Sequence, residues 1–167
     1  MKEQIVLKNI NDFENKSLLI VDDDNPFRER LARAMEKKGF EVTQAESVQK
    51  GIEYVKAKKP GFAVVDLRLG DGNGLEVVKE IQNTNSESRI IMLTGYGNIP
   101  TAVAAVKHGA IDYLAKPADA DDVEKALLAD PRGTLFEPWS IINFLAEFRA
   151  WTSIESPMAV PAAWASK

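Results

Sequence analysis

Three short runs of this chain contain only apolar residues, and a polar side chain follows each of them at once. Leu18–Val21 leads into Asp22, Phe62–Val65 leads into Asp66, and Ile90–Leu93 leads into Thr94. Such runs are typical of strands that are covered on both faces, as in a parallel sheet between two layers of helices. A carboxylate at the end of a buried strand is costly unless a cation or hydrogen-bond donors lie beside it. The runs therefore predict a sheet with charged groups and their partners gathered at one edge.

Between these runs, apolar residues recur at helical spacing. The inward positions of five expected helices are Phe27, Leu31, Ala34 and Met35; Val48, Ile52 and Val55; Leu75, Val78 and Ile81; Val103 and Val106; and Val123, Ala126 and Leu127. Two further runs, Phe40–Gln44 and Ile111–Leu114, alternate apolar and polar residues, as strands with one exposed face do. Along the chain, five expected strands alternate with five expected helices. This order predicts an α/β fold, a doubly wound five-stranded parallel sheet with helices on both faces. Placing the alternating strands at the edges gives the flavodoxin-like order 2-1-3-4-5, counted along the chain.

Local signals indicate where the helices begin and end. Asn25 and Pro26 are typical of an N-cap and a first helical residue, and Ser47 is typical of a second N-cap. Gly39 is expected to end the first helix, and the fifth is expected to begin near Asp119.

The composition is that of a globular protein, with 45% apolar and 28% charged residues among 167. A net charge of −4 provides no general basic surface for nucleic acid or an anionic membrane. The absence of cysteine excludes disulfides, thiolate metal sites and cysteine nucleophiles. Residues 1–16 form a leader without a signal-peptide core, and its apolar residues either pack on the domain or fray. No stretch reaches membrane-spanning length, so we expect a cytoplasmic protein without membrane contact.

In a parallel sheet the carboxyl ends of the strands share one edge, where such folds bind ligands. That edge should gather the carboxylates of Asp22, Asp23 and Asp66 with Thr94 and Lys116. Three clustered carboxylates repel one another, so either the pKa of one of them rises or a cation lies among them, and oxygen ligands without His or Cys favour Mg²⁺. Together with an ammonium and a hydroxyl, these groups are suited to phosphoryl transfer onto an aspartate.

Four motifs at these strand ends resemble the receiver domain of two-component response regulators. They are Val21-Asp22-Asp23, Asp66 after an apolar strand, Leu93-Thr94-Gly95, and Tyr113-Leu114-Ala115-Lys116-Pro117. The resemblance covers residues 17–129. The sequences of residues 23–27 and 115–119 are similar to those of the RegA/PrrA/ActR group of redox-responsive regulators.

The resemblance implies a response regulator that accepts a phosphoryl group on Asp66 from a sensor histidine kinase. Asp23, Asp66 and the backbone carbonyl of Arg68 would bind Mg²⁺, and Asp22 would hold waters of the metal. Lys116 would pair with the phosphoryl oxygens. Such a protein catalyses its own phosphotransfer and dephosphorylation but is a switch rather than a metabolic enzyme.

The resemblance also implies a switch that carries the signal away from the site. Thr94 would turn toward the phosphoryl group and Tyr113 would follow it inward, which would change the surface of the fourth helix, the fifth strand and the fifth helix. The peptide before Pro117 would be cis. Arg68 and Tyr96 stand two residues after Asp66 and Thr94, and we expect them to tune dephosphorylation.

Two other interpretations of the acidic residues stay open at this point. Asp22, Asp23 and Asp24 could be only a solvated helix start, with Asp24 as the capping member. Asp22 and Asp24 also have the spacing of an aspartate-nucleophile phosphohydrolase. The glycine-rich stretch 70–74 lacks the Gly-Lys-Ser/Thr of a phosphate-binding loop, so we interpret it as a flexible turn. Many receivers carry a proline near position 70, and its absence here leaves the rigidity of this loop open.

The tail, residues 130–167, differs from the rest of the chain. It contains all three tryptophans, four of the eight prolines and as many acidic as basic residues beyond Asp130. Residues 139–151 predict one helix with a wide apolar face. Regulators of the RegA group end in a Fis-type helix-turn-helix, but this tail has no recognisable one and few of the basic residues that bind phosphates. We therefore do not expect this chain to bind DNA by itself.

Three interpretations of the tail stay open: packing on its own domain, docking across a homodimer near the fourth and fifth helices, or a replaced C-terminus. The output is accordingly either protein contact by the switch surface or transcription regulation through an unrecognised C-terminal element.

Overall fold

The computed structural model describes residues 8–95 and 112–129, and for Thr94, Asp112 and Tyr113 it describes the backbone alone. The expected fourth helix, Tyr96 and the tail from residue 130 lie outside these residues. Among the described ranges, none of the helices is long and apolar enough to cross a membrane.

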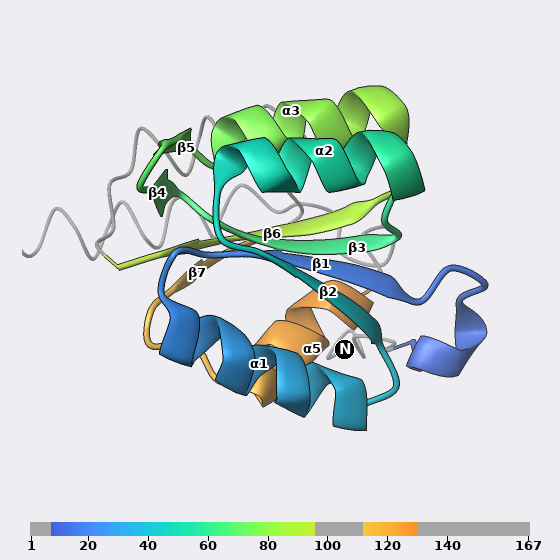
Figure 1. The fold of residues 1–167 in the computed structure, drawn as a ribbon. Helices are drawn as coiled ribbons and strands as arrows, with labels where there is room; N and C mark the ends of the chain where they lie inside the picture. Colours follow the sequence, from blue (N-terminus) through green and yellow to red (C-terminus); the bar gives the residue numbers. More distant parts are fainter. Residues whose placement is uncertain (1–7, 96–111, 130–167) are drawn as a thin grey trace, which may run out of the picture. The chain divides into compact units, whose positions relative to one another are not determined.

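A five-stranded parallel sheet forms the centre of the domain (Figure 1). Its strands, in spatial order, are β2 (Glu41–Ala45), β1 (Ser17–Val21), β3 (Phe62–Asp66), β6 (Arg89–Thr94) and β7 (Asp112–Ala115). This confirms the predicted order, with both alternating strands at the edges. All four ladders are parallel, so the strands end at the same side of the sheet.

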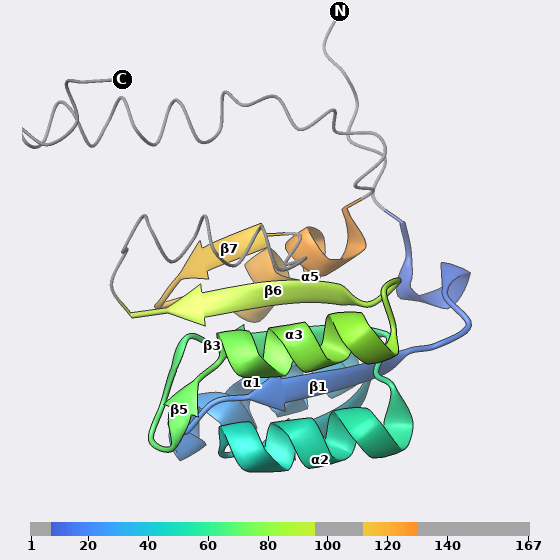
Figure 2. The same ribbon diagram turned by 90° about the horizontal axis from the view of Figure 1, so that it is seen from above.

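Helices cover both faces of this sheet, and the described part of the chain places two on each face (Figures 1 and 2). One face carries α1 (Asn25–Lys37) and α5 (Ala120–Leu128), and the other carries α2 (Val48–Lys58) and α3 (Leu75–Thr84). Successive residues of β1 point to opposite faces, so Leu18 and Ile20 belong to one core while Leu19 and Val21 belong to the other. This two-sided burial explains why the central strands are continuous apolar runs.

The first helix begins one residue earlier than predicted. Asp24, not Asn25, is the N-cap, because its Oδ1 accepts the backbone N–H of Phe27 at 3.1 Å. Asn25 and Pro26 are therefore the first two helical residues, where a missing N–H does no harm. Ala32, which the predicted stripe left out, is buried in place of the half-buried Ala34.

The other predicted helix signals are confirmed. Ser47 caps α2 by accepting the N–H of Lys50, and Asp119 caps α5. Gly39 follows α1 with φ +97°, a backbone conformation that favours glycine.

Part of the expected leader belongs to the core. A short 3₁₀ turn, η1 (Ile10–Asp12), buries Ile10 against α1 and α5. The ring of Phe13 packs edge-on against Phe62, with 5.1 Å between centroids. The expectation that the leader packs on the domain is therefore confirmed for Ile10 and Phe13, while residues 1–7 lie outside the described residues.

The glycine-rich stretch is a small hairpin rather than a plain flexible turn. Its strands are β4 (Arg68–Leu69) and β5 (Gly72–Asn73), paired antiparallel. Gly74 is required by space, since a Cβ there would lie 2.0 Å from the backbone oxygen of Asp66. The interpretation of residues 70–74 as flexible was wrong for Gly74, whose φ of −56° is open to any residue.

We expect Gly74→Ala to lower the free energy of unfolding by about 1–3 kcal/mol, because the new methyl group overpacks the backbone beneath Asp66. Gly70→Ala is the matched control, since its Cβ would meet nothing closer than Asp23 Oδ2 at 3.7 Å. Urea denaturation of both variants measures the difference. Equal midpoints for the two variants would contradict the close approach at Gly74.

Candidate functional site

Three carboxylates meet where β1 and β3 end. Asp22 and Asp23 follow β1, Asp66 is the last residue of β3, and these strands are neighbours in the sheet. One oxygen of each lies within 4.8 Å of the others. Asp22 and Asp66 are buried, with 1% and 7% of their surface exposed, whereas Asp23 is exposed. The predicted acidic cluster therefore exists, and it opens to solvent through Asp23.

Lys116 supplies the positive charge of the cluster. It follows the edge strand β7, and its Nζ lies 2.6 Å from Asp22 Oδ2 and 2.6 Å from Asp66 Oδ2. The ring of Phe27 lies beside the same ammonium, at 4.7 Å from Nζ to centroid. The peptide between Lys116 and Pro117 is cis, as the resemblance implied. One cation thus joins two carboxylates from different strands.

Burial and ion pairing together set the charges of these groups. Burial raises the pKa of the Asp22 carboxyl, more than its contacts with Lys116 and the Asp24 amide lower it. For Lys116, burial lowers the pKa, but the hydrogen bonds to Asp22 and Asp66 outweigh it and the pKa is raised. Lys116 therefore stays charged at neutral pH, and its ammonium is paired with two of the three carboxylates, Asp22 and Asp66.

This donor set fits a hard divalent cation. The three carboxylates offer oxygen ligands alone, and the exposed Asp23 leaves room for waters, an arrangement that Mg²⁺ prefers. The backbone N–H of Arg68 donates to Asp66 Oδ1 at 3.1 Å, and the Arg68 side chain is exposed. The part of the Arg68 carbonyl as a ligand stays a prediction.

Thr94 and Tyr113 are placed only by their backbones. Thr94 ends β6, the neighbour of β3, and Tyr113 lies in β7 opposite Met92. The backbone position of Thr94 agrees with the shared strand edge that the sequence predicts, whereas Tyr113 lies inside β7, two residues before the end of that strand. Their roles as switch residues stay predictions, and Tyr96 lies outside the described residues.

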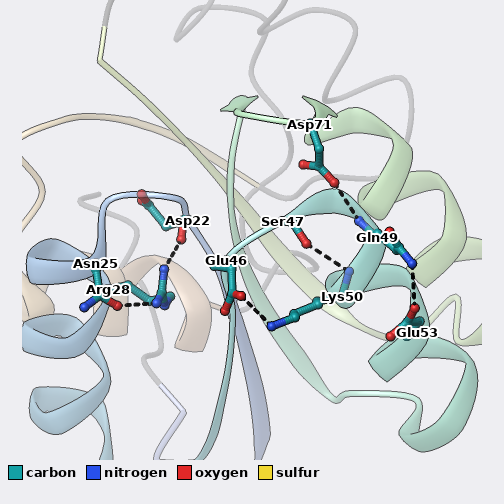
Figure 3. A network of polar contacts seen from close by, with 9 residues as sticks. All are labelled: Asp22, Asn25, Arg28, Glu46, Ser47, Gln49, Lys50, Glu53 and Asp71. Atoms are coloured by element: carbon teal, nitrogen blue, oxygen red, sulfur yellow. Dashed lines mark hydrogen bonds and ion pairs between the residues drawn. The ribbon is translucent and has the colours of Figure 1, made fainter.

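Arg28 is a buried member of this region that the sequence analysis missed. Its Nη1 donates to the backbone oxygen of Asp22 at 2.5 Å, and its Nη2 donates to Asn25 Oδ1 (Figure 3). A cation in the first turn of a helix opposes the helix dipole and needs a nearby partner. That conflict was the available signal, because the acidic residues 22–24 directly precede the helix.

Asp24 does not belong to the cluster. Its carboxylate caps α1 through the amide of Phe27, and Asp22 Oδ1 in turn accepts the amide of Asp24. This arrangement confirms the capping interpretation for Asp24 and takes away the second carboxylate that an aspartate-nucleophile phosphohydrolase would use.

Comparisons with known proteins identify the family that this arrangement resembles. The model of the response regulator receiver domain matches residues 18–128, well over half of the chain. The acid tolerance regulatory protein ActR of Sinorhizobium medicae is 60% identical over 124 residues, which cover 74% of this chain and 63% of ActR. The photosynthetic apparatus regulatory protein RegA of Rhodobacter capsulatus is 61% identical over 115 residues, which cover 69% of this chain and 62% of RegA.

A solved structure agrees with these relatives. A response regulator protein from Burkholderia pseudomallei, described with a phosphorylated aspartic acid, a calcium ion and citrate, has a TM-score of 0.67 at 34% identity. The similarity covers 87% of this chain and 78% of that chain. The matches to ActR and RegA each span less than two thirds of those proteins' own lengths.

We expect Asp22→Asn to raise the free energy of unfolding at pH 7 when divalent cations are absent, because it removes a buried negative charge and keeps an oxygen for the Asp24 amide. The folded-state pKa of Asp22 lies above the ordinary value of 3.8, so the parent protein loses stability as the pH rises from 3.8 through that folded-state pKa. The difference between variant and parent should open over this interval and stay constant above it. Urea denaturation across the acid range in chelator measures the difference, and a difference that does not change with pH would contradict the effect of burial.

Proposed function

This chain belongs to the response regulator receiver family, and on that premise we propose that Asp66 accepts a phosphoryl group from a sensor histidine kinase. The observation that supports this most is the contact of Lys116 Nζ with Asp66 Oδ2 at 2.6 Å, inside the cluster with Asp22 and Asp23. A carboxylate held beside a fixed ammonium can attack phosphorus without a separate base.

In the proposed step, an oxygen of Asp66 attacks phosphorus and the bond between phosphorus and the donor nitrogen breaks, which leaves an acyl phosphate on Asp66. Lys116 moves its hydrogen bond to a phosphoryl oxygen and neutralises part of the charge that develops there. Asp23, Asp66 and the carbonyl of Arg68 would hold Mg²⁺, with Asp22 on its waters. When bound, Mg²⁺ supplies further charge neutralisation on the transferring group.

The product then acts as a signal. Thr94 would donate a hydrogen bond to the phosphoryl group and Tyr113 would follow it, which changes the surface around β7 and α5. That surface, or the helix predicted at residues 139–151, would form a homodimer or contact an output partner. The chain is thus a regulatory switch whose only chemistry is its own phosphorylation and dephosphorylation.

We expect Asp66→Asn to abolish labelling by a small phosphodonor such as acetyl phosphate with Mg²⁺, because the amide is no nucleophile for phosphorus. Intact mass spectrometry detects the added phosphoryl group, and hydroxylamine should remove it from the parent protein as it does from acyl phosphates. Asp24→Asn is the matched control, since asparagine also caps helices and the Asp24 carboxylate accepts the N–H of Phe27 at the start of α1. Labelling that survives Asp66→Asn, or that is lost equally in Asp24→Asn, would refute the assignment.

We expect Tyr96→Ala to shorten the half-life of the phosphorylated protein severalfold, because the ring would restrict the approach of water to the acyl phosphate. The decay of labelled protein after removal of the donor gives the half-life. Tyr96→Phe keeps the ring and should behave as the parent. An unchanged half-life in Tyr96→Ala would discard this role.

A further inference from the structure

Asp71, at the tip of the β4–β5 hairpin, caps a helix from a distant part of the chain. Its Oδ1 accepts the N–H of Val48 at 2.8 Å. Its Oδ2 accepts the N–H of Gln49 at 3.1 Å, the contact drawn in Figure 3. These two hydrogen bonds hold the pKa of Asp71 below its ordinary value. Ser47 caps the same helix locally by accepting the N–H of Lys50. Helix α2 therefore has one cap of its own and one from the hairpin.

The hairpin held by Asp71 is the segment that directly follows Asp66. Arg68, the first residue of β4, donates its N–H to Asp66 Oδ1, and the next residue of β4, Leu69, is buried in the same core as Val48. A Cβ on Gly72 would lie 3.3 Å from Val48 Cγ2, so the hairpin already lies close against the start of α2. Asp71 thus ties the segment after Asp66 to α2 in a loop that lacks the proline many receivers have.

The other acidic segment is tied to the same place. The backbone N–H of Asp22 donates to the oxygen of Ala45 at 3.1 Å, where β2 ends. Three residues later, Val48 donates to Asp71. Residues 45–48 therefore join the segment that carries Asp22 and Asp23 to the segment that follows Asp66.

We propose that Asp71 is a positioning residue for the cation site, because its two hydrogen bonds set the spacing between the Asp22–Asp23 segment and the Asp66–Arg68 segment. This inference rests on the proposed Mg²⁺ and phosphoryl site. Groups that orient metal ligands without touching the metal contribute strongly to affinity, since a cation gains most from oxygens already held in place.

A purely structural role for Asp71 predicts something different. If Asp71 only caps α2, its loss should lower stability as the loss of Ser47 does and leave Mg²⁺ binding alone. Ser47→Ala is therefore the matched control, because it removes a cap from the same helix turn without releasing the hairpin. Asp71→Asn is an intermediate variant, because it keeps an oxygen acceptor for Val48 but loses both the negative charge and the acceptor for Gln49.

The experiment is a titration of the full chain with Mg²⁺ at constant pH and ionic strength, followed by the amide NMR resonances of residues 22–24 and 66–68. We expect Asp71→Ala to weaken Mg²⁺ binding about tenfold, the lower end of the range for groups that orient metal ligands. Asp71→Asn, which keeps one of the two hydrogen bonds, should lose less affinity than Asp71→Ala, and Ser47→Ala should keep the parent affinity. Urea denaturation of each variant, run in parallel, shows that all are folded and how much stability each has lost.

Three results would overturn the inference: parent affinity in Asp71→Ala, an equal loss in Ser47→Ala, or a loss in Asp71→Asn as large as in Asp71→Ala, because the hydrogen bond kept to Val48 should preserve part of the affinity. Asp23→Asn tests the underlying proposal in the same titration. If the parent protein shows no Mg²⁺ binding that depends on Asp23, the proposed site fails and this inference fails with it. If the parent binds through Asp23 and Asp71→Ala binds equally well, the inference alone is wrong.

Discussion

The ammonium of Lys116 between two buried carboxylates is the interaction on which the rest of the site depends. Because β1 and β3 are neighbours, their ends bring Asp22 and Asp66 together, and two unit charges about 4 Å apart repel by about 4 kcal/mol at the effective dielectric constant near a protein surface. Lys116 contacts both at 2.6 Å from the edge strand, across β6. Loss of the ammonium would leave two buried carboxylates unpaired, a kind of change that costs about 3–5 kcal/mol, so the cluster needs its cation even before any ligand binds.

The sheet could be predicted because the apolar or polar character of each successive residue indicates whether a strand is buried on one face or on both. Leu18–Val21 and Phe62–Val65 face helices on both sides and contain no polar residue, whereas β2 and β7 have a neighbouring strand on one side only and alternate. What escaped prediction depends on distances between segments. The packing of Ile10 arises from contacts with remote parts of the chain, which no local pattern encodes. The strands of the hairpin at residues 68–73 are adjacent in sequence, but Asp71 joins the hairpin to the distant residues Val48 and Gln49.

The candidate site likewise contains residues that could be predicted from the sequence and residues that could not. Residue type and strand order were enough to bring Asp22, Asp23, Asp66 and Lys116 together, because parallel strands share an edge. They were also enough to leave Asp24 out of the cluster as a helix-capping residue, but they placed the N-cap at Asn25, one residue late, since the cap depends on the backbone angle at one residue. Arg28 and Asp71 were missed for a related reason, as each acts through backbone groups of another segment that a sequence motif does not specify.

The position of Lys116 directly after β7 has a consequence for the synthesis of the protein. A ribosome releases the chain from its N-terminus, so Asp22 and Asp66 emerge before the lysine that neutralises them. If β1, β2 and β3 paired before Lys116 emerged, Asp22 and Asp66 would lie together without their ammonium and would need cations from the surrounding solution. The segment that completes the sheet at the β7 edge therefore also brings the positive charge that neutralises Asp22 and Asp66.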